Sequence, residues 1–329
     1  MSGIDEFLAG ATAVAPVEDV TVAEEVSPSE APPSSTEPSG VVEIITPSGI
    51  QIYYQAAPRR LYRIRLHADV VPEGDEEDYA EWREVVSCSK VTGILDKPGL
   101  VHWGEEIGVK GVQELLRQNF CDAENLKSWS TEMTRDLMKR KGLRTWQSRD
   151  KAADRGTSVH RALEGWAMSD GGELVSPEVF PQAEQGYVIG LNRFLSESGF
   201  VPTKSEVIVA SLLHGLAGRF DLMGRIPEPV SLVTKLTKAG KEHRETVQPD
   251  SYLCDLKTSS GIYDEYHLQV AGYQGMCVES GYEKPNQTAI LRVSVDGKYE
   301  FKQGVAEWLD FWWAKGLYDS LAAIKERVR

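Results

Sequence analysis

Hydrophobic and polar residues alternate along four segments in the second half of the chain, as they do in strands that lie in a partly buried sheet. These segments lie near residues 205–212, 216–224, 252–258 and 288–295. Apolar residues instead recur at helical spacing in two segments, near residues 155–168 and 264–280. This succession predicts an α/β (α+β) fold, in which helices flank a central mixed β-sheet.

Further strands and helices are predicted around this core. Alternating segments near the N-terminus predict a small antiparallel sheet, at residues 41–46, 50–55 and 61–66, and a further alternating segment follows at residues 82–88. Helical spacing predicts additional helices at residues 105–120, 124–141, 182–198 and 305–327. Ser89 is expected to cap a short helix that ends at Leu95, and Asp154 is expected to open the helix at 155–168. Residues 225–250 predict a hairpin between two core strands, and Asp296-Gly297 predicts a tight turn.

Composition divides the chain into three parts. Residues 1–40 are rich in Pro, Ser, Glu, Ala and Val and are expected to form a disordered acidic tail. Residues 41–88 form the small β-rich region, and residues 89–329 form the main domain. The formal net charge of the 329 residues is −14, but residues 1–50 contain nine acidic residues and no Lys or Arg. The acidity therefore does not exclude a nucleic-acid partner for the main domain.

The sequence also predicts the compartment and the state of the cysteines. No apolar run is long enough to span a membrane, and the N-terminus lacks the features of a signal peptide, so a soluble cytoplasmic protein is expected. The four cysteines, Cys88, Cys121, Cys254 and Cys277, are widely scattered. Their spacing fits neither a zinc knuckle nor an iron–sulfur cluster, and buried, reduced thiols are expected.

The candidate chemistry is concentrated on two of the core strands. Strand alternation places Asp255 and Lys257 on one face of their strand, and Asp221 lies on a neighbouring predicted strand. Two carboxylates can hold a divalent cation, and an ammonium can stabilise charge on a phosphate, which together suit metal-assisted phosphodiester cleavage. Taken alone, Asp-x-Lys is also typical of a surface ion pair.

Two further groups of residues bear on this chemistry. Gln269 and Tyr273 stand four residues apart on one helix face that could overlook the strands. A basic run includes Lys139, Arg140, Lys141 and Arg144. Such a run is either a solvated helix face or a surface that follows a phosphate backbone, and the sequence leaves both interpretations open.

Taken in order, five elements of the chain resemble the motif series of PD-(D/E)XK nucleases. They are Gly156-Thr-Ser-Val-His160, Glu206 on a strand, Gly218-Arg-Phe-Asp221, Asp255-Leu-Lys257 and Gln269-x-x-x-Tyr273. The series is most similar to the RecB-like branch, which includes CRISPR-associated exonucleases and many phage exonucleases. The segment from Ser89 to Trp103 also looks like the N-terminal region of the phage members. The resemblance covers residues 85–325 and implies a restriction-endonuclease-like core.

The resemblance implies roles for individual residues. A metal ion would be bound by His160, Asp221, Asp255 and the backbone carbonyl of Leu256, and Lys257 would be the catalytic lysine. Glu206 matches an acidic residue that belongs to the catalytic group but reaches the metal in only some families. Gln269 and Tyr273 would contact the nucleic-acid backbone or support the site. The cation would be Mg²⁺ or Mn²⁺, and a histidine ligand suits Mn²⁺ better.

The expected function is therefore that of a metal-dependent DNA exonuclease that processes ends in recombination, replication or repair, most similar to phage enzymes of the host cytoplasm. Its partner would be DNA, as single strands or duplex ends, with a recombination protein as a possible second partner and no membrane. Many relatives hold an iron–sulfur cluster with a close group of cysteines after the core, whereas no cysteine follows Cys277 here. A version without the cluster is expected. The alternatives are a non-catalytic DNA-binding or assembly module and a structure-selective endonuclease.

Overall fold

The computed structural model describes residues 41–56, 60–67, 81–95, 98–169, 173–237 and 239–328. The chain divides into two units, residues 1–34 and 35–329, and every described residue lies in the second. The expected disordered tail at residues 1–40 lies outside the described residues. Within them, no helix is long and apolar enough to cross a membrane.

The centre of the fold is a mixed sheet of nine strands within the described part of the chain. The order is β1-β2-β3-β4-β6-β9-β10-β11, and β5 also pairs with β6. The neighbours β4–β6 and β9–β10 are parallel, and the others are antiparallel. The strands are β1 (Val41–Ile45), β2 (Ile50–Gln55), β3 (Leu61–Leu66), β4 (Arg83–Ser87), β5 (Val201–Ser211), β6 (Leu216–Ile226), β9 (Asp250–Lys257), β10 (Gln287–Val293) and β11 (Tyr299–Gln303). The predicted mixed sheet is confirmed.

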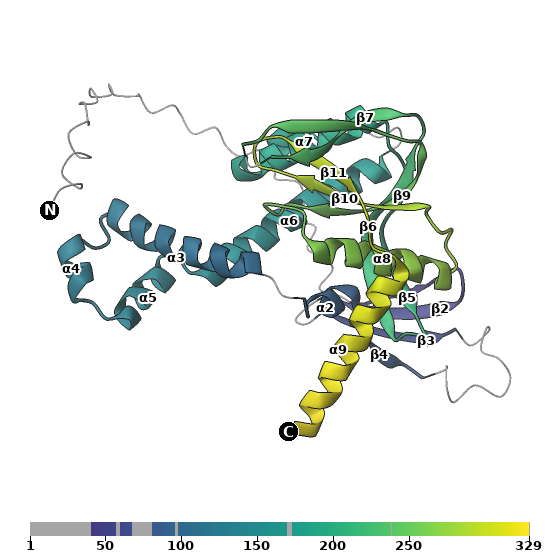
Figure 1. Cartoon of the computed structure of the whole chain (residues 1–329), viewed down its shortest axis with the longest axis horizontal. Coiled ribbons are helices and arrows are strands. Elements are labelled where there is room, and N and C mark those ends of the chain that lie inside the picture. The colour runs from purple at the N-terminus through teal and green to yellow at the C-terminus, as the bar shows by residue number, and fades with distance from the viewer. Residues whose placement is uncertain are drawn as a thin grey trace. The chain divides into compact units, whose positions relative to one another are not determined.

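Helices cover both faces of this sheet (Figure 1). On one face, α6 (Thr145–Met168) and α7 (Gln182–Ser198) pack over apolar side chains that include Cys254 and Leu256. On the other, α2 (Cys88–Thr92), α8 (Asp264–Glu279) and α9 (Trp308–Val328) pack over side chains that include Leu253. Because β9 alternates between two apolar layers, Asp255 and Lys257 extend toward the α8 side.

The N-terminal strands continue the same sheet. Val86 and Ser87 of β4 pair with Leu216 and Ala217 of β6. A separate hydrophobic cluster unites β2, β3 and β4 with the ends of β5 and β6.

The four cysteines are buried and free, as expected from their spacing.

Four helix predictions differ from the structure. The segment 124–141 is not one helix but two, α4 (Ala123–Ser128) and α5 (Thr131–Arg140), because Trp129 is extended and the Ser130 side chain accepts a hydrogen bond from Met133 N. The helix preceding them, α3, spans Pro98–Arg117. The cap of α2 is Ser87 rather than Ser89, since Ser87 Oγ accepts from Lys90 N.

The fourth difference is the start of α6. This helix begins at Thr145 and runs through Asp154 without interruption, so Asp154 does not open it. Gln147 Oε1 instead accepts a hydrogen bond from the backbone N–H of Arg144 and closes the first turn. A short 3₁₀ helix, η2 (Pro177–Val179), connects α6 to α7.

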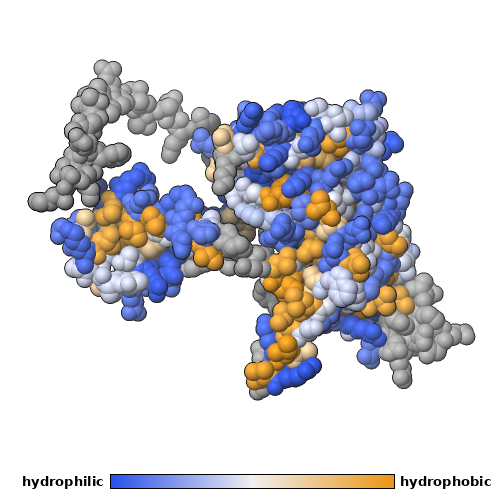
Figure 2. Space-filling view, in the orientation of Figure 1, coloured by the Kyte–Doolittle hydropathy of each residue, from blue (hydrophilic) through white to orange (hydrophobic). Residues whose placement is uncertain are grey.

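The last helix, α9, is half-embedded. Phe311 and Lys315 are buried where α9 packs on α8, whereas large apolar side chains along the rest of the helix are exposed. Figure 2 shows hydrophobic residues along the exposed surface of α9.

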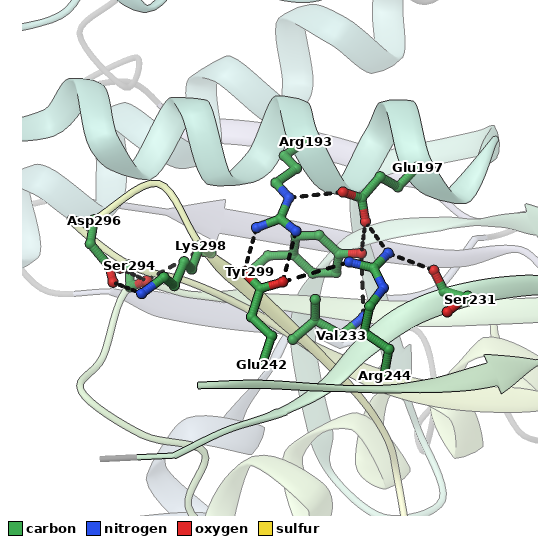
Figure 3. Close-up of polar contacts among 10 residues, drawn as sticks. All are labelled: Arg193, Glu197, Ser231, Val233, Glu242, Arg244, Ser294, Asp296, Lys298 and Tyr299. Carbon is green, nitrogen blue, oxygen red and sulfur yellow. Dashed lines mark hydrogen bonds and ion pairs between the residues drawn. The ribbon is translucent and has the colours of Figure 1, made fainter. Parts of the chain in front are cut away.

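The predicted hairpin at 225–250 is confirmed as β7 (Val230–Leu236) and β8 (Glu242–Val247). Figure 3 shows how ion pairs fix it to α7. Arg193 donates two hydrogen bonds to Glu242, at 2.5 and 2.8 Å, and one to Glu197 at 2.8 Å. Glu197 also accepts hydrogen bonds from Arg244 and from the hydroxyl of Tyr299, each at 2.5 Å.

Candidate active site

The motif residues converge on one cleft of about 560 Å³. His160 comes from α6, Glu206 from β5, Asp221 from β6, and Asp255 and Lys257 from β9. Gln269 and Tyr273 reach the same cleft from α8. Residues that are up to 113 positions apart in the chain thus surround one space because β5, β6 and β9 are neighbours in the sheet.

Three of these side chains form a tight cluster at the floor of the cleft. His160 Nδ1 lies 3.2 Å from Asp221 Oδ1 and 3.5 Å from Glu206 Oε1. One ligand atom from each of the three residues lies within 4.8 Å of the other two. The resemblance left open whether Glu206 reaches the metal, whereas the geometry places Glu206 beside His160 and Asp221.

Burial and mutual attraction set the charges in this cluster. Burial disfavours the imidazolium of His160, but Asp221 and Glu206 outweigh it and raise the pKa of His160 to about 10. Burial also opposes the carboxylate of Asp221, yet His160 holds the pKa of Asp221 below its ordinary value. A histidine must be neutral to bind a metal, so a cation that bound here would release a proton.

Glu206 reaches the cluster through an unusual backbone conformation. Its φ angle is +53°, in the left-handed region that residues other than glycine rarely adopt in a strand. Its neighbours Ser205 and Val207 pair regularly with β6, and the register of β5 shifts only further back, between Pro202 and Lys204. Arg219 Nε holds the other carboxylate oxygen at 2.9 Å. Strain of this kind concentrates at functional sites.

Arg219 is a site residue for which the sequence assigned no role. It lies two residues before Asp221, inside the motif Gly218-Arg-Phe-Asp221, and lines the same cleft. Its position in a strand of alternating character was the only signal that could have indicated it. Arg60 and Arg161 also line the cleft, and neither of them was assigned a role at this site from the sequence.

The carboxylate of Asp255 pairs with Lys257 rather than joining the cluster of His160, Glu206 and Asp221. Its Oδ2 pairs with Lys257 Nζ, and Asp255 is not among the three residues whose ligand atoms approach one another. Burial, reinforced by the Asp221 carboxylate, raises the pKa of Asp255 to about 6 despite the opposing effect of Lys257. Although burial opposes its charge, Lys257 has a raised pKa because Asp255 and Asp221 stabilise the ammonium. Lys257 Nζ also lies 5.0 Å from the centre of the Tyr266 ring.

The backbone of Leu256 takes part in the same site. The ladder between β6 and β9 ends at the pair Leu222 and Cys254, and Leu256 N then donates to Asp221 Oδ2 at 2.6 Å. The N–H and C=O of one strand residue face the same neighbour. The carbonyl of Leu256, a predicted ligand, therefore faces the β6 side of β9.

The wall on the α8 side is closed by two hydrogen-bonded residues. Gln269 Nε2 donates to Tyr273 Oη at 2.7 Å, and Tyr273 is buried. The ring of Tyr273 packs so closely on β6 that a Cβ atom at Gly218 would lie 2.5 Å from it. Tyr273 can therefore line the cleft only because residue 218 is glycine.

The predicted basic run lies away from this cleft. Lys139, Arg140, Lys141 and Arg144 are at the end of α5 and the start of α6, and none of them lines it. Lys139, Arg140 and Lys141 are exposed, and Lys141 Nζ lies 3.7 Å from the centre of the Phe120 ring. These four residues thus lie outside the lining of the cleft.

The donor set fits a divalent cation. Two carboxylates and an imidazole are ligands that Mn²⁺ and Mg²⁺ sites use, with Mn²⁺ the better match for nitrogen. Glu206 Oε1 is buried and accepts no hydrogen bond among the described residues, which leaves it available to a ligand.

No protein-family model matches the chain, and no curated protein matches it either. The function is therefore inferred from the residues and geometry of the cleft.

Proposed function

We propose that this protein is a metal-dependent nuclease with a restriction-endonuclease-like core of the RecB-like PD-(D/E)XK branch. Its substrate would be DNA, and its reaction would be the hydrolysis of phosphodiester bonds, proceeding from ends. The observation that carries the proposal is the meeting of His160, Glu206, Asp221 and the Asp255–Lys257 pair in one cleft. These residues also follow the order of the nuclease motifs along the chain.

The residues of the cluster would hold the cation. His160, Glu206 and Asp221 supply its ligands, and Asp255 and the Leu256 carbonyl lie on the adjoining strand. A cation held there lowers the pKa of bound water and neutralises phosphate charge. Arg219 positions Glu206 through its ion pair at 2.9 Å.

Lys257 would act on the reacting phosphate. The carboxylate of Asp255 and the ring of Tyr266 hold the ammonium within the cleft. A buried cation stabilises negative charge that develops in the transition state more strongly than an exposed one does. Asp255 keeps Lys257 protonated for this purpose.

The lining of the cleft suits a phosphate backbone. Arg60 and Arg161 add positive charge to its lining, and the hydroxyls of Ser87 and Ser89 add hydrogen-bonding groups. Such groups bind phosphates of any sequence. The cleft is therefore suited to a nucleic-acid strand rather than to a small apolar ligand.

The direct test is incubation with end-labelled linear DNA and with covalently closed circular DNA, in Mn²⁺, in Mg²⁺ and in a chelator. Progressive loss of the linear substrate with a divalent cation, and survival of the circle, is the expected result. Cleavage of the circle would identify an endonuclease, and no cleavage of either with both cations would refute the proposal.

Two variants separate metal binding from chemistry. Asp221→Asn should lose Mn²⁺ binding in a calorimetric titration, because an amide carries no charge. Lys257→Ala should retain Mn²⁺ binding but lose turnover by a factor of at least ~100, the size of effect that one oxyanion-stabilising group has. Asp136→Asn and Lys284→Ala, at exposed positions outside the cleft, are the matched controls. Full activity of Lys257→Ala would refute its assigned role.

A further inference from the structure

The exposed face of α9 has a hydrophobic stripe for which the described structure contains no partner. The side chains recur at helical spacing along nearly the whole helix and are 39–82% exposed. They are Leu309, Trp313, Leu317, Leu321, Ile324 and Val328. Figure 2 shows hydrophobic residues gathered along the exposed surface of α9. Single exposed apolar residues are ordinary, but a contiguous row on one helix face marks an interaction surface.

The second half of α9 also lacks tertiary support. Phe311 and Lys315 are its buried residues, and Tyr318 is the last of its residues that packs against a hydrophobic cluster in the described structure. From residue 319 to 328 no side chain is buried. Helices in proteins are stabilised mainly by packing of their apolar face. The second half of α9 therefore gains little stability from the rest of the described structure.

We propose that the stripe on α9 pairs with the same stripe of a second copy of this chain, as an antiparallel helix pair about a twofold axis. The charges at the two ends of α9 favour a second, antiparallel copy of this helix as the partner. Its first turn carries Asp310, and its last turn carries Lys325, Glu326 and Arg327, which together are net positive. In an antiparallel pair, the acidic end of one copy lies along the basic end of the other, and the helix dipoles are opposed. A parallel pair would place like charges together.

The positions along the stripe match across such an axis. With the axis between Tyr318 and Asp319, Trp313 faces the partner's Ile324 and Leu309 faces the partner's Val328. Gly316 and Ser320, both small, flank the axis and allow the helices to approach closely. If all six apolar side chains lost their whole exposed area, they would contribute roughly 600 Å² per copy, the lower end of the range for a standard interface of about 1,200–2,000 Å² in total.

Oligomeric state provides the first test. Sedimentation equilibrium of the full chain at micromolar concentration should give a dimer. Leu317→Glu places two carboxylates near the axis and should weaken the dimer at least tenfold. The control is Leu213→Glu, because Leu213 is 81% exposed but lies on the turn between β5 and β6, outside α9. A monomeric wild-type chain, or a dimer that Leu317→Glu leaves intact, would overturn the proposal.

Cysteine cross-linking tests the direction and register. The native cysteines are buried, so a cysteine introduced on α9 is the reactive one. A mixture of Trp313→Cys and Ile324→Cys chains should form a disulfide between unlike chains. Trp313→Cys alone should not form a disulfide. The two copies of residue 313 would be about 16 Å apart along the helix axes, at a rise of 1.5 Å per residue. A disulfide in Trp313→Cys alone indicates parallel pairing, and no disulfide in the mixture excludes this register; either result overturns the proposal. Neither measurement depends on nuclease activity.

Discussion

Because the backbone of Glu206 is left-handed, we expect a glycine variant at this position to be more stable than an alanine variant, the reverse of the usual order in a strand. In an ordinary strand, glycine is less stable than alanine by about 0.5–1 kcal/mol, because glycine loses more conformational freedom on folding. At φ +53° a Cβ atom instead costs roughly 1–2 kcal/mol that glycine avoids. Glu206→Gly should therefore be more stable than Glu206→Ala by about 0.5–1 kcal/mol.

The comparison isolates the backbone because both variants lose the same contacts. Each removes the ion pair with Arg219 and the approach to His160. Both should also weaken Mn²⁺ binding to the same degree, since neither keeps the carboxylate. A difference in unfolding free energy then reports the strain that positions Glu206 in the wild-type protein.

Urea unfolding followed by circular dichroism measures this difference. The matched control is Glu245, an exposed residue of β8, where Glu245→Ala should be more stable than Glu245→Gly. If Glu206→Ala proved more stable than Glu206→Gly, the backbone at Glu206 would not be strained, and the argument that strain marks this site would fail.

Three other predictions follow from the structure. Gly218→Ala should displace the ring of Tyr273, lower the free energy of unfolding by about 1–3 kcal/mol and reduce DNA cleavage. A melting curve and the DNA cleavage assay measure the two effects. Unchanged melting and cleavage would contradict the packing argument. Burial opposes the charge of Glu197, but hydrogen bonds from Tyr299, Arg244 and Arg193 hold the pKa of Glu197 below its ordinary value. The Glu197 carboxylate therefore stabilises the fold at neutral pH, and this stabilisation is lost as the pH falls through the folded-state pKa. Arg193→Met should therefore melt at lower temperature at pH 7 and lose less stability on acidification than the wild type; parallel melting profiles would contradict this. Neutralising the four basic residues between Lys139 and Arg144 should weaken DNA binding to all sequences alike and flatten its salt dependence, and an unchanged salt slope would assign them to a solvated helix face.

Local patterns in the sequence were sufficient to predict the secondary structure of the core. Alternation identified β6 and β9, and helical spacing identified α7 and α8, because each pattern is the periodicity of a single element with one or two buried faces. The order of short motifs indicated the residues that line the cleft. These predictions depend on residues that are close together in the chain.

Local patterns were less reliable at helix ends. The break at Trp129 and the early start of α6 depend on which backbone groups find a hydrogen-bonding partner, such as the Ser130 hydroxyl and the Gln147 amide. Several side chains near each end could have supplied that partner. Periodicity does not distinguish among them.

The details of the site were decided only by the tertiary structure. Pairing of β5, β6 and β9 brings Glu206 and Asp221 to His160, while Asp255 is oriented toward Lys257. The left-handed conformation of Glu206 is maintained by contacts with residues of other elements, including Arg219 on β6, and no neighbouring residue in the chain requires it. The sequence thus determined which residues could carry the chemistry. Their distances and charges follow from contacts between distant segments, which exist only once the sheet has formed.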